Sequence, residues 1–178
     1  MARVFEDEFM DLHSSIISLC KELVRDVLDV DMIYAYCSIE GGSYSFNAFF
    51  TVQGKAVTLK GVDVSHAMKS KFLDIGIGET RKIRELCKEF ERPTPTEIKM
   101  IYNARTRQFT AEYQYKPMET MDIGIHDLFM GWVKEIDPNY GKETQAVAPA
   151  VEVQSSAPTE EPKKKPGFRF PFFGKGRK

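Results

Sequence analysis

The residues that most often carry chemistry are few and scattered in this chain. Its three histidines are His13, His66 and His126, and they are too far apart in the sequence to show the spacing of metal ligands. This pattern favours histidines with structural or solvated side chains. An enzyme would require distant polar residues to meet in one cleft, and the set to examine is His66, Glu79 and Asp127.

Two glycine motifs could in principle hold a phosphate group. "GIGETRK" at 76–82 begins like a dinucleotide-binding loop, but Arg81 stands at its third glycine position and no adjoining strand precedes it. Gly41-Gly42 separates two alternating aromatic segments, and a strand rather than a helix follows, so the pair predicts the bend of a hairpin. The sequence therefore predicts no catalytic, cofactor-binding or metal site.

Helices and strands follow from the period of the apolar residues. Intervals of three or four predict helices, and intervals of two predict strands. The stretch 65–72 shows neither period clearly. The elements that we expect are a helix over 4–28, strands over 33–39, 44–52 and 55–60, a helix over 79–91, strands over 97–103 and 108–115, and a helix over 125–136.

This order predicts an α+β fold, in which an antiparallel sheet of about five strands carries helices packed on one face. We expect one domain over residues 1–140, because 178 residues with 42% hydrophobic content suffice for a single core. From residue 141 onward the periodicity stops, which predicts a disordered linker and tail over 141–178. Three widely spaced cysteines, no secretion signal and no long apolar run favour a cytoplasmic protein.

Charge is unevenly distributed between these two parts. Seven of the 25 Lys and Arg residues lie in 163–178, and the remaining 18 face all 26 Asp and Glu residues, which gives residues 1–162 a formal charge of −8. The tail "KKKPGFRFPFFGKGRK" interleaves phenylalanines with bases and could contact a membrane surface, nucleic acid or a partner's groove. Its candidate contact residues are Lys163, Lys164, Lys165, Phe168, Arg169, Phe170, Phe172, Phe173, Lys175, Arg177 and Lys178.

Several segments between residues 5 and 136 resemble the YezG family of bacterial immunity proteins, the antitoxins of polymorphic toxin systems. They are the long first helix, "IYAYCSIEGGSYSFNAFF", "SHAMKSKF", "RELCKEF", "PTEIKMIYNARTRQFTAEYQY" and a last helix that carries Trp132. The resemblance implies a protein that binds its cognate toxin, often a nuclease, and blocks the active site. An acidic domain would complement the cationic cleft of such a toxin.

The acidic residues that we expect to contact a toxin are Glu8, Asp11, Glu112, Glu119, Asp122 and Asp127. Each of them could instead be an ordinary solvated charge, and an acidic first helical turn is already favourable for the helix dipole. The alternative function is an adaptor or binding module that its basic and aromatic tail tethers to a membrane or to nucleic acid.

Overall fold

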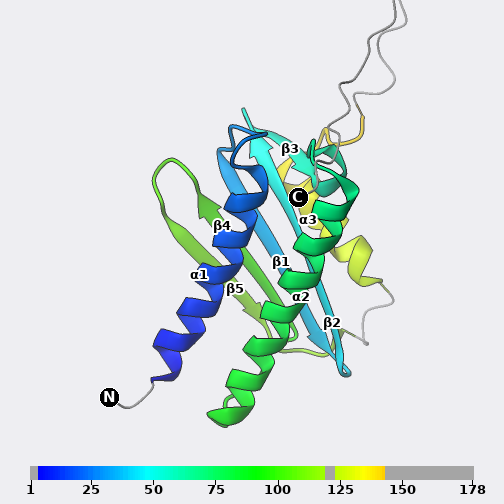
Figure 1. The fold of residues 1–178 in the computed structure, drawn as a ribbon. Coiled ribbons are helices and arrows are strands. Elements are labelled where there is room, and N and C mark those ends of the chain that lie inside the picture. The colour runs from blue at the N-terminus through cyan, green and yellow to red at the C-terminus, as the bar shows by residue number, and fades with distance from the viewer. Residues whose placement is uncertain (1–3, 119–122, 143–178) are drawn as a thin grey trace, which may run out of the picture. The chain divides into compact units, whose positions relative to one another are not determined.

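The computed structural model of this chain describes residues 4–118 and 123–142. The chain divides into two units, residues 1–145 and 146–178, and the described residues all belong to the first. Figure 1 shows its elements, which are α1 (Phe5–Val24), β1 (Met32–Glu40), β2 (Ser43–Val52), β3 (Lys55–Thr58), the 3-10 helix η1 (Leu59–Gly61), α2 (His66–Glu89), β4 (Glu97–Asn103), β5 (Phe109–Gln114) and α3 (Ile125–Ile136). The α+β class and the predicted order of helices and strands are confirmed.

The five strands form one antiparallel sheet in the order β3-β2-β1-β4-β5. β1 lies at the centre, where Ala35 pairs with Ala48 of β2 and with Met100 of β4. The bend between β1 and β2 is Gly41-Gly42, with φ angles of 57° and 85°. These left-handed values suit glycine, so the hairpin interpretation of this motif is confirmed.

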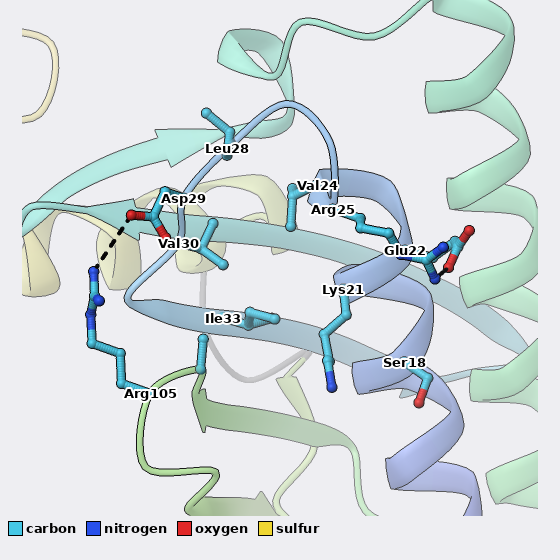
Figure 2. Close-up of a pocket in the computed structure, with 11 residues that line it drawn as sticks. Ser18, Lys21, Glu22, Val24, Arg25, Leu28, Asp29, Val30, Ile33 and Arg105 are labelled. Carbon is cyan, nitrogen blue, oxygen red and sulfur yellow. Dashed lines mark hydrogen bonds and ion pairs between the residues drawn. The ribbon is translucent and has the colours of Figure 1, made fainter.

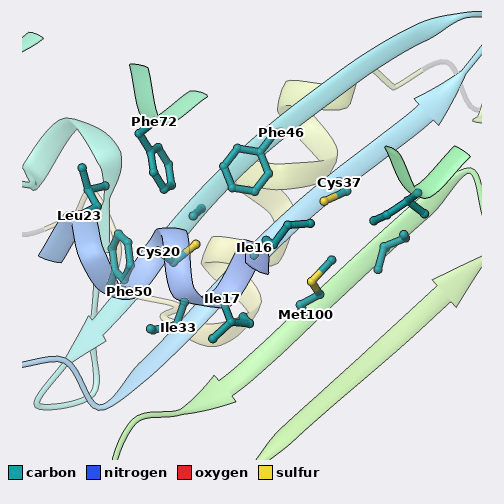
Figure 3. Packing of buried hydrophobic residues seen from close by; sticks show 14 of the residues in the cluster. Ile16, Ile17, Cys20, Leu23, Ile33, Cys37, Phe46, Phe50, Phe72 and Met100 are labelled. Atoms are coloured by element: carbon teal, nitrogen blue, oxygen red, sulfur yellow. The ribbon is translucent and has the colours of Figure 1, made fainter. Parts of the chain in front are cut away.

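α1 and α2 lie side by side over one face of the sheet (Figure 1). Their apolar stripes meet the alternate residues of β1 and β2 in a buried core that includes Ile16, Cys20, Ile33, Phe46 and Phe50 (Figure 3). A stripe with a period of three or four residues faces the sheet along the whole of a helix, so one face of each helix is buried and the other is exposed.

α3 packs on the opposite face, so the prediction that all helices share one face is wrong for this element. Trp132 meets Tyr34 and Phe49 edge-on, with ring centroids 5.5 and 5.2 Å apart, and Phe129 meets Tyr36 at 5.9 Å. The centre of the sheet therefore carries large side chains on both faces. The physical reason is that burying only one face would leave three aromatic rings of β1 and β2 in water.

α2 begins at His66, thirteen residues before the predicted start. Ser65 caps it, because its Oγ accepts a hydrogen bond from the Met68 amide at 3.2 Å. The early turns of α2 show no clear helical period in the sequence, because Met68 and Ile75 are exposed on their outer surface and Gly76 interrupts the apolar stripe. Elsewhere the differences are small: α1 ends at Val24, and η1 replaces the end of the predicted third strand.

Candidate functional site

An acidic groove lies between α1 and α2. It has a volume of about 460 Å³ and is lined by Glu8, Asp11, Leu12, Ser15, Glu79, Lys82, Glu85, Leu86 and Glu89. Two of the predicted contact residues, Glu8 and Asp11, therefore lie in one opening with three carboxylates of the neighbouring helix. The lining is five acids and one base, a formal charge of −4.

Helix geometry places these carboxylates in two facing rows. On α1, Glu8 and Asp11 are three residues apart, and on α2, Glu85 and Glu89 are four apart. Residues at these intervals lie on the same side of a helix. The buried faces of α1 and α2 fix their rotation against the sheet, and that rotation turns the two acidic rows toward each other.

The base of the groove, Lys82, pairs with Glu79. Lys82 Nζ lies 2.6 Å from Glu79 Oε1, and the Glu79 side chain is only 12% exposed while that of Lys82 is 58% exposed. Lys82 therefore sits over Glu79 at the opening of the groove. The groove keeps a negative field, because carboxylates still outnumber bases in its lining.

The other predicted acidic contacts do not join this groove. Phe109 and Ala111 of β5 pack toward α1, so Glu112, which alternates with them, points to the opposite face of the sheet. Asp127 is exposed in the first turn of α3, which packs on that opposite face. Glu119 and Asp122 lie outside the described residues, and so do all the tail residues predicted to make contacts, from Lys163 to Lys178.

The three residues of the possible catalytic set do not converge. His66 and Glu79 stand at the start and in the middle of one helix, thirteen residues or about 20 Å apart along its axis. Asp127 belongs to α3 on the other face of the sheet. Among the described residues, no group of three or more His, Cys, Asp or Glu side chains could hold a metal ion.

His13 is fully buried between α1 and β5. Its Nδ1–H donates to the Phe9 carbonyl, and its Nε2 lies 3.2 Å from the Tyr113 hydroxyl. Burial lowers the pKa of His13 below its usual 6.5, which favours the neutral ring and leaves Nε2 to accept a hydrogen bond from the Tyr113 hydroxyl. This histidine is structural, since it ties the edge strand to the helix.

A larger groove, of about 820 Å³, lies at the carboxyl end of α1 (Figure 2). Its arginines are already paired with nearby acids: Arg25 with Glu22, and Arg105 with Asp31 at 2.7 Å and with Asp29 at 3.8 Å. These pairs cancel most of the local charge. The acidic groove is therefore the stronger candidate, because its lining keeps one dominant sign.

The comparisons assign no family: no known family model matches this chain, and no curated protein matches it. Within 4–118 and 123–142, no helix is long and apolar enough to cross a membrane.

Sequence reasoning missed Glu85 and Glu89 as site residues. Their spacing of four along a predicted helix was a usable signal, but only the contact of α1 with α2 shows that they face Glu8 and Asp11.

Proposed function

We propose that this chain is an immunity protein, which binds a cognate secreted toxin and neutralises it by covering the toxin's active site. The observation that carries the proposal is the acidic groove, where five carboxylates and one ammonium group line a single opening. An enzyme that cuts nucleic acid attracts phosphate groups and so presents a cationic surface, which this groove complements. The resemblance to the YezG family is what favours a toxin over other cationic partners.

The groove suits protein side chains that carry a positive charge on an apolar stem. Leu12 and Leu86 contribute apolar surface to the lining, and carboxylates surround them. A lysine or arginine of the partner could pack its methylene groups on the leucines and place its charge among Asp11, Glu85 and Glu89. An arginine would gain the most, because its guanidinium can bind a carboxylate through two hydrogen bonds.

Charge at this groove should act mainly on the rate and the specificity of association. Opposite potentials guide two proteins together, and this guidance weakens as salt screens the exposed charges. The formal charge of −8 on residues 1–162 adds to the same field. An antitoxin that must capture its toxin before damage occurs benefits from fast association.

The test begins with the genes that neighbour this chain's own gene, where a large secreted protein would be the candidate toxin. Its toxic domain is expressed with the wild-type chain or with the triple variant D11K/E85K/E89K, and growth and inhibition of the purified toxin are measured. The wild-type chain should protect cells and titrate the toxin at a one-to-one ratio. The variant should raise the inhibition constant roughly 100-fold or more, because several opposite-charge contacts become repulsive.

A matched control changes the same number of charges outside the groove. Asp26, Asp74 and Glu135 are exposed and do not line it, so D26K/D74K/E135K alters the net charge equally. This control should slow association modestly and keep protection. Equal loss of protection in both triple variants would contradict the groove as the contact surface, and a wild-type chain that inhibits no neighbouring gene product would contradict the immunity function.

A further inference from the structure

β5 forms one edge of the described sheet, with a neighbouring strand on one side only. The carbonyl groups of Gln108 and Gln114 point toward β4, since they accept hydrogen bonds from the Asn103 and Thr96 amides at 2.9 and 2.8 Å. Peptide groups of successive residues in a strand point to opposite sides. The peptide groups of the odd-numbered residues therefore face away from the sheet.

The residues of β5 whose backbone N–H and C=O groups face away from β4 are Phe109, Ala111 and Tyr113. The strand, "FTAEYQ", contains no proline and a single charged residue, Glu112. Natural edge strands are usually blocked by proline, by lysine or by a bulge within the strand. β5 between 109 and 114 carries none of these, so its outer edge can accept a further strand.

We propose that β5 pairs antiparallel with β5 of a second copy of this chain, around a two-fold axis at Ala111. This register places Phe109 opposite Tyr113 of the second copy, and the reverse, so that two aromatic pairs form on the face toward α1. On the other face, Thr110 lies opposite Glu112 of the second copy. An axis at Glu112 would instead place two carboxylates directly opposite each other, which is unfavourable.

The charges of α1 favour a second copy over other partners. α1 runs antiparallel to β5: Phe9 lies 5.7 Å from Tyr113, while Lys21 lines a small groove with Phe109. The middle of β5 therefore lies beside Ser14, midway between Asp7 and Lys21. A two-fold axis at this point brings each Asp7 toward Lys21 of the second copy, so that opposite charges meet twice.

Exposed apolar surface lies on the same side. Tyr113 is 37% exposed, and Met10, which is 44% exposed, stands one helical turn before Ser14. Such side chains are enriched in the centres of protein interfaces. The acidic groove lies on the other flank of α1, beside α2, so the dimer leaves it open. The inference therefore does not rest on the proposed function.

Sedimentation equilibrium of the full chain over a micromolar to millimolar series tests the dimer. Thr110 is exposed and lies opposite Glu112 of the second copy in this register. We expect T110K to tighten the dimer and T110E to weaken it, each by on the order of tenfold in the dissociation constant, because every substitution acts twice across the axis. In both variants, residue 110 still pairs with Ile101 of β4 in the same chain.

The double variant T110E/E112K should restore dimer formation, because each introduced carboxylate then lies opposite an introduced ammonium group of the second copy. A wild-type chain that remains at 20.4 kDa throughout the series overturns the inference. A dimer with the same dissociation constant for T110E and T110K also overturns it, since that dimer would use another surface. No toxin is present in these measurements, so their failure is separate from failure of the immunity function.

Discussion

Gly76 of α2 lies against the ring of Phe46 on β2. A Cβ atom built on Gly76 would stand 1.9 Å from Phe46 Cδ1, far inside van der Waals contact. Glycine in the middle of a helix costs roughly 1 kcal/mol relative to alanine. The close approach of ring and backbone explains why glycine stands at this position: the helix can lie near the sheet only where no side chain intervenes.

Replacing Gly76 with alanine should destabilise the fold. The added methyl group must displace a buried ring, and overpacking of this kind costs roughly 1–3 kcal/mol. Gly78, two residues further along α2, has nothing within 4 Å of its Cβ position. Urea unfolding should therefore show a loss of stability for G76A and a gain of up to about 1 kcal/mol for G78A. A smaller side chain in place of the ring, as in G76A/F46L, should recover part of the loss; equal stability of G76A and G78A would contradict this packing.

His13 should make stability depend on pH near neutrality. Because burial lowers its pKa in the folded state, the unfolded chain binds a proton more readily as pH falls below 6.5. The contribution of His13 to the free energy of unfolding is therefore complete above pH 6.5. It decreases as the pH falls from 6.5 toward the lower pKa of the folded state, with a slope that approaches about 1.4 kcal/mol per pH unit. Denaturant unfolding across this window should show the slope in the wild type and in H66Q, which changes an exposed histidine, and a reduced slope in H13Q.

The three cysteines should be unreactive in the folded protein. Cys20, Cys37 and Cys87 are all buried, and burial raises the pKa of each thiol, that of Cys37 to about 12. Only the thiolate reacts readily, so a thiol reagent at neutral pH should label none of them until denaturant is added. S18C, at an exposed position, should add one thiol that reacts at once. Rapid labelling of the native wild-type chain would contradict the burial of these residues.

Removal of residues 146–178 distinguishes the proposed function from the adaptor alternative. The remaining unit keeps every residue that lines the acidic groove. If the groove binds the toxin, the shortened chain should protect cells and inhibit the toxin as the full chain does. Loss of protection at normal protein levels, accompanied by a change of location in the cell, would instead favour a tethered adaptor.

The sequence was most informative where one periodicity continues through an element. The bounds of β4 and α3 are those that alternation and helical spacing predict, because Ile98 and Met100 of β4 alternate into the core under α1 and α2, and the apolar stripe of α3 is buried on the other face of the sheet. The start of α2 was missed for the opposite reason: Met68 and Ile75 are apolar but exposed. The local signal for this start in the sequence is Ser65, whose side chain caps the amide three residues later.

The face on which a helix packs is not encoded by its own periodicity. α3 has a clear apolar stripe, yet only the strands show where that stripe is buried. Tyr34 and Tyr36 alternate with the apolar row of β1, and Phe49 does the same on β2. Large rings on both sides of a strand indicate burial on both faces. The sequence could not predict the acidic groove for a related reason, since the groove exists only where α1 meets α2.

The central position of β1 sets how the chain must assemble. Its pairing with β2 is local, across the turn at Gly41-Gly42, whereas its pairing with β4 joins residues about sixty positions apart, as the hydrogen bond from the Tyr36 hydroxyl to Glu97 illustrates. Closing so long a loop lowers the conformational entropy of the chain before the contacts between β1 and β4 form and offset this cost. We therefore expect two ribbons, β1–β2–β3 and β4–β5, to form early, and the seam between β1 and β4 to govern the folding rate.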